Sequence, residues 1–139
     1  MAASQAPTGP ALKGKGADIS LDKAWHGVHY LLCGKPEPGS SVLSQAVLGG
    51  TEIGDDEMGY GPARVFTAQQ VADIARELSR AGLEAEMKAR FDPDQMNGIY
   101  PEGWDTAGAL DWLLEEFRHL RDFYADASAR QYAVVTCLV

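Results

Sequence analysis

The stretch LDWLLEEFRHLRDFYADA (residues 110–127), followed after three residues by QYAVVTCLV (131–139), decides the class of fold. Its first part carries large apolar side chains at helical spacing: Leu110, Leu113, Leu114, Phe117, Leu120 and Tyr124. This spacing predicts a long helix from about Thr106 to Ala127. The second part is β-branched and almost wholly apolar, which is typical of a strand covered on both faces. A long amphipathic helix that leads into an interior strand indicates an α+β protein.

The long helix has a second set of large side chains. At about 100° per residue, Trp112, His119 and Phe123 fall opposite the leucine-rich stripe. A helix with two such faces is either sandwiched inside the domain or presents one face to a partner. We therefore treat Trp112, His119 and Phe123 as a candidate interface, with a central helix as the alternative.

Upstream segments add shorter elements. Helices are predicted at about 21–32, which Gly34 and Pro36 end, at 42–48, from Thr67 to Leu78 and at 83–91, and a short one follows Pro93. Thr67 and Gln70 have the spacing of a capping box, and residues 63–66 read as a short strand. The sequence thus predicts one α+β domain, mostly helical, with helices packed on a small sheet that includes the C-terminal strand.

The first nineteen residues are rich in Ala, Gly, Pro and Lys and have almost no large apolar side chains. Such a segment buries too little surface to offset the entropy of ordering it. We expect residues 1–19 to form a flexible or extended tail, and residues 20–139 to form the domain.

Charge and cysteine content limit the classes of partner. The chain of 139 residues has a net charge of −8, which argues against binding to nucleic acid or to an anionic membrane surface. No apolar run approaches the roughly 20 residues that span a bilayer, and the N-terminus lacks the apolar core of a secretory signal. A cytoplasmic location is expected, with Cys33 and Cys137 as reduced thiols inside apolar segments and a disulfide between them as the alternative.

The segment LDKAWHGVHYLLCG (21–34) places His26, His29 and Cys33 on one helix. A zinc site needs three or four converging ligands, and the sequence has no paired CxxC or HExxH to complete one. A Cys–His nucleophile is disfavoured because Cys33 lies at a helix C-terminus, whose dipole raises a thiol pKa. The favoured interpretation of His29 is a core-boundary residue hydrogen-bonded to a neighbouring segment, while His26 looks incidental.

Other chemical motifs are also lacking. The acidic loop with Asp55, Asp56 and Glu57 does not follow the EF-hand pattern. The phosphate-binding loop, the dinucleotide-binding motif and the serine-hydrolase elbow are missing. The sequence therefore predicts no metal and no cofactor.

Aromatic and cationic residues in irregular segments mark a candidate pocket. Tyr60 and Arg64 lie in one such segment and Tyr100 and Trp104 in another, with His29 expected at the edge. Large aromatics beside Gly and Pro often line pockets, and an Arg can hold an anion. Alternatively, these aromatics cover the core.

Five blocks of sequence, in order, resemble the YfbM-like family, a bacterial domain family of unknown function. They are LDKAWHGVHYLLCG, LSQAVLGG, GYGPARVF, IYPEGW and the 110–127 helix with its following strand. Asp22, Lys23, Trp25, His29, Leu32 and Gly34 match the first block, whereas His26 and Cys33 do not. The resemblance implies a small α+β domain and no agreed catalytic residues. Members usually begin with a strand and a helix ahead of the first block, whereas a polar tail stands in their place here. Either the chain is a short variant, or the missing strand leaves an open sheet edge, which favours a dimer.

These observations lead to two hypotheses about function. The first is a small cytoplasmic binding or interaction module that works through a protein partner, including a second copy of itself. The second is an enzyme or small-molecule-binding protein that uses the pocket near His29, Arg64, Tyr100 and Trp104, with an unknown ligand.

Overall fold

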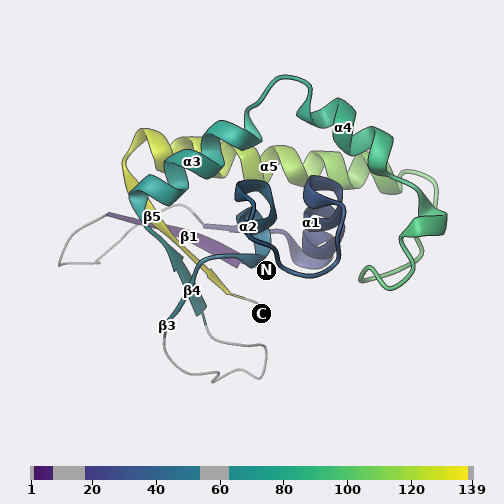
Figure 1. Ribbon diagram of the computed structural model, residues 1–139, viewed down its shortest axis with the longest axis horizontal. Coiled ribbons are helices and arrows are strands. Elements are labelled where there is room, and N and C mark those ends of the chain that lie inside the picture. The colour runs from purple at the N-terminus through teal and green to yellow at the C-terminus, as the bar shows by residue number, and fades with distance from the viewer. Residues whose placement is uncertain (1, 8–17, 54–62, 138–139) are drawn as a thin grey trace.

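A five-stranded antiparallel sheet forms one layer of the protein in the computed structural model, which describes residues 2–7, 18–53 and 63–137 (Figure 1). The strands are β1 (Ala2–Pro7), β2 (Asp18–Ser20), β3 (Thr51–Ile53), β4 (Ala63–Phe66) and β5 (Tyr132–Cys137). Their order across the sheet is β2-β1-β5-β4-β3. The C-terminal strand β5 is therefore interior, between β1 and β4, as its apolar sequence predicts.

The helices form the second layer. They are α1 (Trp25–Cys33), α2 (Val42–Leu48), α3 (Ala68–Leu78), α4 (Leu83–Arg90) and α5 (Ala109–Ala129), with 3-10 turns η1 (Asp22–Ala24) and η2 (Pro93–Gln95). The long helix α5 extends from the sheet end of the molecule to the far end of its longest axis (Figure 1). Helices α3 and α5 pack on the sheet, while α1 and α4 contact each other beyond it.

Strand register explains which face of the sheet is buried. Phe66 of β4 is paired with Val134 of β5, so both side chains point to the same face. Both are fully buried, and the Phe66 ring meets the ring of Tyr124 in α5 edge to face. This face therefore carries the core between sheet and helices. Tyr124 is itself buried and donates its hydroxyl proton to the carbonyl of Ala46 in α2, at 2.7 Å.

Local signals place several elements where the sequence predicts them. Helix α2 and strand β4 have the expected bounds. Thr67 and Gln70 form the complete capping box at the start of α3. Gly34 ends α1 with φ of 78°, and its N–H bonds to the carbonyl of Tyr30. The α+β class, with mostly helical content and a sheet that includes the C-terminal strand, is confirmed.

The N-terminal segment takes part in the sheet. Strand β1 lies between β2 and β5, with Ala3 opposite Thr136 and nearly inaccessible to solvent. A strand therefore precedes the first helix, and the expectation that this strand is missing is wrong. The structure also adds β3, which the sequence does not predict. Residues 8–17 of the expected tail lie outside the described residues.

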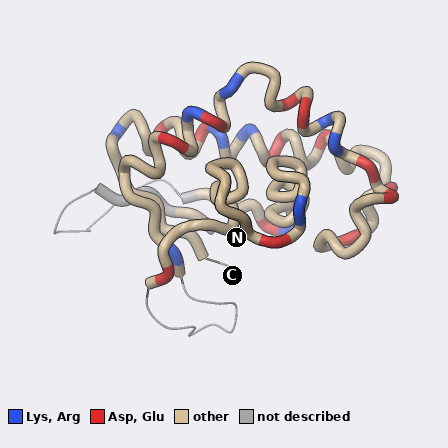
Figure 2. Tube along the Cα trace, viewed as in Figure 1, with Lys and Arg blue, Asp and Glu red and all other residues tan. Residues whose placement is uncertain are grey.

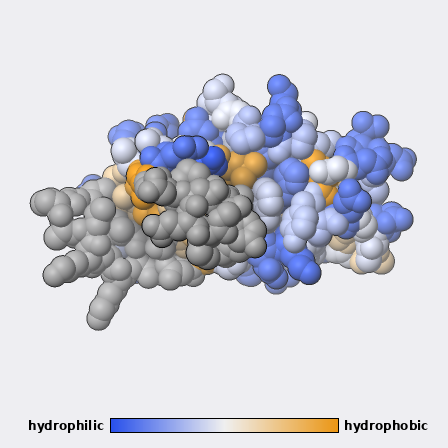
Figure 3. All heavy atoms as spheres, turned by 90° about the horizontal axis from the view of Figure 1, so that it is seen from below, coloured by the Kyte–Doolittle hydropathy of each residue, from blue (hydrophilic) through white to orange (hydrophobic). Residues whose placement is uncertain are grey.

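Two features of the described residues concern their polarity. None of their helices is both long and apolar enough to cross a membrane. Seen from below, the described part of the surface is largely hydrophilic, and its hydrophobic atoms form small separate areas (Figure 3).

Candidate functional site

His29 and Cys33, the pair at the centre of the sequence analysis, lie close together on α1. The imidazole of His29 is fully buried. Its Nε2 lies 2.8 Å from the carbonyl oxygen of Glu37, so Nε2 carries the proton and donates it. The sulfur of Cys33 lies 3.4 Å from the same nitrogen and also contacts the carbonyls of His29 and Lys35.

The protonation of this pair does not suit nucleophilic catalysis. Burial lowers the pKa of His29, partly offset by the hydrogen bond to Glu37. Burial raises the pKa of the Cys33 thiol, so the thiolate is disfavoured. The protonated Nε2 cannot accept the thiol proton, and Nδ1 is buried with no hydrogen-bond partner in the described part of the chain. The pair is a part-buried polar contact that ties α1 to the following loop.

His26 has a role that the sequence does not reveal. Its Nδ1 accepts a hydrogen bond from the backbone N–H of Tyr100, and its Nε2 donates to the carbonyl of Pro36, both at 2.9 Å. The ring also stacks on Trp25, which in turn stacks on Tyr100. His26 therefore fastens the 97–108 segment to α1. Its main partner lies 74 positions away, so no local pattern indicates the contact.

Arg64 lies apart from the other described residues of the candidate pocket. Arg64 lies in β4, where it donates to the carbonyl of Leu48 and pairs with Glu52. Strand β4 and the loop that follows α4 lie toward opposite ends of the longest axis (Figure 1). Tyr60 lies outside the described residues. Of the four described residues, Tyr100 and Trp104 belong to one segment.

The candidate interface residues also separate. Phe123 is buried and packs edge to face on Tyr124, whereas His119 is exposed. Trp112 is 37% exposed and stacks on Trp104, with ring centroids 6.2 Å apart. The structure thus joins one residue of the predicted interface to one residue of the predicted pocket.

Trp104 is held firmly in place. It is 5% exposed, and its Nε1–H donates to the carbonyl of Ile99 at 2.9 Å. Gly27 allows the ring to lie against α1, because a Cβ there would come within 2.7 Å of the indole and of Leu113. Trp104 therefore forms a fixed support for the more exposed Trp112.

Two hollows adjoin Trp104. The first, the tryptophan groove, has a volume of about 290 Å³ and is lined by Glu102, Gly103, Trp104, Thr106, Ala107, Gly108, Ala109 and Trp112. The second, the acidic groove, has a volume of about 260 Å³ and is lined by Pro93, Asp94, Met96, Asn97, Glu102, Gly103, Trp104 and Asp105. They share Glu102, Gly103 and Trp104, so the two grooves are neighbours.

The segment that builds these grooves is strongly acidic. Residues 91–117 contain seven carboxylates and no Lys or Arg. The carboxylates are Asp92, Asp94, Glu102, Asp105, Asp111, Glu115 and Glu116. In Figure 2 the loop between α4 and α5, at the right of the view, carries acidic positions and no basic ones. A cation is the ligand that this charge favours.

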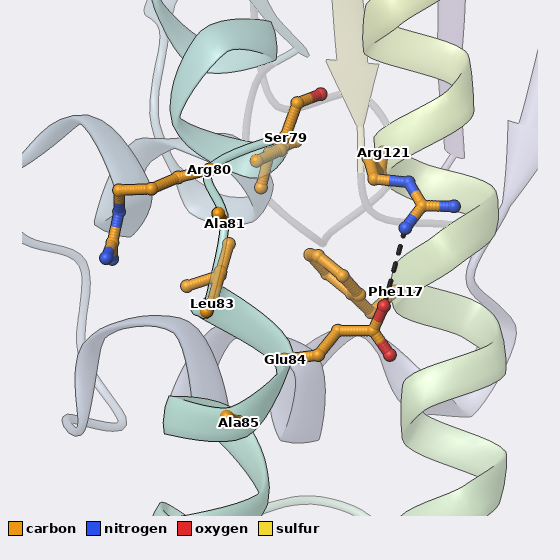
Figure 4. Close-up of a pocket in the computed structure, with 10 residues that line it drawn as sticks. Ser79, Arg80, Ala81, Leu83, Glu84, Ala85, Phe117 and Arg121 are labelled. Atoms are coloured by element: carbon orange, nitrogen blue, oxygen red, sulfur yellow. Dashed lines mark hydrogen bonds and ion pairs between the residues drawn. The ribbon is translucent and has the colours of Figure 1, made fainter.

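A third cavity, of about 330 Å³, lies between the α3–α4 connection and α5 (Figure 4). Phe117 and Arg121 of α5 face Glu84 of α4 across it. Glu84 pairs with Arg118 at 2.7 Å and with Arg121 at 3.5 Å, and Arg80 pairs with Glu86. Because these charges neutralise one another, this cavity is best explained as the junction that joins α4 to α5.

Fold and grooves together describe a small α+β domain. No group of three or more His, Cys, Asp or Glu side chains is placed to hold a metal ion within residues 2–7, 18–53 and 63–137. A protein family described as a domain of unknown function, DUF1877, matches residues 5–137, and the chain belongs to this family.

A solved structure gives the same result for the fold. The crystal structure of YfbM from Escherichia coli, a protein of unknown function, is similar with a TM-score of 0.73. The match covers 99% of this chain and 98% of that chain at 18% sequence identity. No curated protein matches the sequence. The resemblance to the YfbM-like family is confirmed, and at this identity the similarity establishes the fold alone.

Proposed function

We propose that the protein is a binding module that works through a protein partner, and that the tryptophan groove is its contact surface. One observation carries this proposal. Trp112 is exposed beside a groove, supported from behind by a fixed second tryptophan. Tryptophan is the residue type most enriched at energetic centres of interfaces, where one ring face is buried by the partner.

The surroundings of Trp112 fit this role. The groove joins an exposed indole to small side chains, Ala107 and Ala109, and has a polar rim at Glu102 and Thr106. An apolar centre with a polar rim is the usual arrangement of a protein interface. Tyr100, which is 45% exposed and stacked on Trp25, extends the aromatic surface at the same end of the molecule.

The burial of His29 disfavours the alternative of an enzyme centred on that residue. A general acid or base has to come within hydrogen-bond reach of its substrate, directly or through one water. His29 has no solvent exposure and its protonated nitrogen is bonded to Glu37.

We also propose a cytoplasmic location, which the two half-buried free thiols, Cys33 and Cys137, support.

The test compares Trp112→Ala with His119→Ala. Both positions are exposed and lie on α5, but only Trp112 lines the groove. Each immobilised variant is exposed to extract from the source cells, and each captured protein is then purified and titrated against the variants by calorimetry. We expect a partner that binds the wild type and the His119 variant, and that binds the Trp112 variant at least about tenfold more weakly. Thermal unfolding confirms that both variants are folded.

Light scattering over a range of concentrations examines whether the partner is a second copy. A dimer that dissociates in the Trp112 variant would make the protein self-associating through this groove. A monomeric protein with no partner that depends on Trp112 would contradict the proposal.

A further inference from the structure

We infer that the tryptophan groove receives a segment of the partner that carries lysine or arginine side chains. This inference rests on the proposed function and adds the chemistry of the partner. Its basis is the juxtaposition of an exposed indole with unneutralised carboxylates around one pair of adjoining grooves.

The indoles provide the first part of the argument. A cation over the face of an aromatic ring is attracted by the negative charge of that face, and tryptophan attracts it most strongly. The Nε1–H of Trp104 already bonds to Ile99, so this polar group is not available to a ligand. The rings of Trp104 and Trp112 lie within 25° of parallel. Such a groove suits the flat guanidinium of arginine or the alkyl stem of lysine.

The carboxylates provide the second part. Glu102 lies between the two grooves and lines both, and Asp94 and Asp105 line the acidic groove. None of these three forms an ion pair within the described part of the chain, in contrast to Glu84, which pairs with two arginines. No Lys or Arg lines either groove. These carboxylates therefore remain available to neutralise basic side chains of a partner.

The same charge disfavours a symmetric dimer through this end. A two-fold contact would bring two acidic segments, each with seven carboxylates in residues 91–117, against each other. Like charges at an interface oppose association. Because the grooves adjoin at Glu102, one segment with two nearby basic side chains can occupy both, with one cation on the indole and another among the carboxylates.

The experiment uses two blocked peptides and nuclear magnetic resonance. The first peptide alternates arginine with glycine, and the second replaces each arginine by citrulline, which keeps the shape and removes the charge. The full chain has three tryptophans, so it gives three indole N–H signals. We expect the arginine peptide to shift the Trp112 signal in a saturable way, and the citrulline peptide to leave it unchanged.

Three variants locate the site. Trp112→Leu is expected to weaken binding about two- to fivefold, and Glu102→Gln is also expected to weaken it. Glu115→Gln is the matched control, because it removes the same charge from an exposed position on α5 that lines neither groove. Its affinity for the arginine peptide is expected to stay within a factor of about two.

Three results would overturn the inference. The first is the absence of binding by the arginine peptide. The second is equal weakening of binding by Glu102→Gln and Glu115→Gln, which would indicate diffuse attraction to an acidic protein. The third is tighter binding of tetramethylammonium than of the peptide, which would indicate a small-cation site. The proposed function is judged separately. A captured partner that depends on Trp112 but not on Glu102, and that binds through a segment without lysine or arginine, would retain the proposed function and reject the basic segment.

Discussion

The imidazole of His29 lies inside the protein with one nitrogen bonded to Glu37 and the other without a polar partner among the described residues. This arrangement stabilises the neutral ring, because a proton on Nδ1 would place a charge in a buried site. Burial accordingly holds the pKa of His29 below its ordinary value of 6.5. The consequence is a dependence of stability on pH.

We predict that the protein loses stability as the pH falls below about 6.5. In that range His29 is protonated in the unfolded chain but stays neutral in the folded chain, because its pKa is lower there. Proton binding therefore favours the unfolded state. The contribution of this residue is complete above pH 6.5 and is lost as the pH falls toward the lowered pKa of the folded state. The loss is at most about 1.4 kcal/mol per pH unit for one proton. Urea unfolding at a series of pH values measures it.

Two variants isolate the contribution of His29 to this dependence. His29→Gln removes the titrating ring and should flatten the profile between about pH 7 and 5, whatever its effect on absolute stability. His119→Gln, which removes an exposed imidazole from α5, is the comparison, and the slope should fall more in His29→Gln than in this variant. Equal slopes for the wild type and His29→Gln would show that His29 does not cause the dependence.

At the scale of elements, the capping box of α3 gives a second prediction. The hydroxyl of Thr67 accepts the N–H of Gln70, while the Gln70 side chain accepts the N–H of Thr67. Thr67→Ala removes the first of these bonds and should lower the free energy of unfolding by about 1 kcal/mol. Thr67→Ser keeps the hydroxyl and should change it by less than about 0.5 kcal/mol. Chemical denaturation compares the three proteins, and equal losses in both variants would show that the hydroxyl is not responsible.

Elements with a local signal could be predicted from the sequence. Helix α2, strand β4 and the start of α3 have caps or patterns within a few residues, and they appear with the expected bounds. Strands β1, β2 and β3 have no such signal. Each of β2 and β3 has only three residues, and β1 is AASQAP, which lacks β-branched side chains. Pairing with distant strands makes these segments extended, and single-sequence patterns do not report such pairing.

The tryptophan groove shows the same limit at the level of the site. The sequence predicts a pocket position for Trp104 and an interface position for Trp112, because Trp112 belongs to the periodic pattern of the helix and Trp104 to the irregular segment before it. Their stacking depends on the path of residues 97–108, which His26 fixes through a contact 74 positions away. One signal was available: the run of 27 residues, 91–117, with seven carboxylates and no basic residue. It marks an acidic surface, although not the groove within it.

For the molecule as a whole, sheet order predicts where amide protons exchange slowly. Strand β5 has a neighbour on each side, and Val134 is fully buried. Strand β3 pairs only with β4 among the described strands, and its three residues are exposed. We therefore expect the amide of Val134 to exchange only through global unfolding, and the amides of Thr51–Ile53 to exchange far sooner. Hydrogen exchange followed by nuclear magnetic resonance tests this order, and equal protection of both strands would contradict it.

The adjacency of β1 and β5 also has a consequence for synthesis. Strand β1, Ala2–Pro7, pairs along its whole length with strand β5, Tyr132–Cys137, which follows every other described element along the chain. A ribosome that has produced only the early and middle parts of the chain cannot supply the strand on which both β1 and β4 depend. The centre of the sheet therefore closes only after β5 has left the exit tunnel, and until then the nascent chain exposes apolar surface that chaperones recognise.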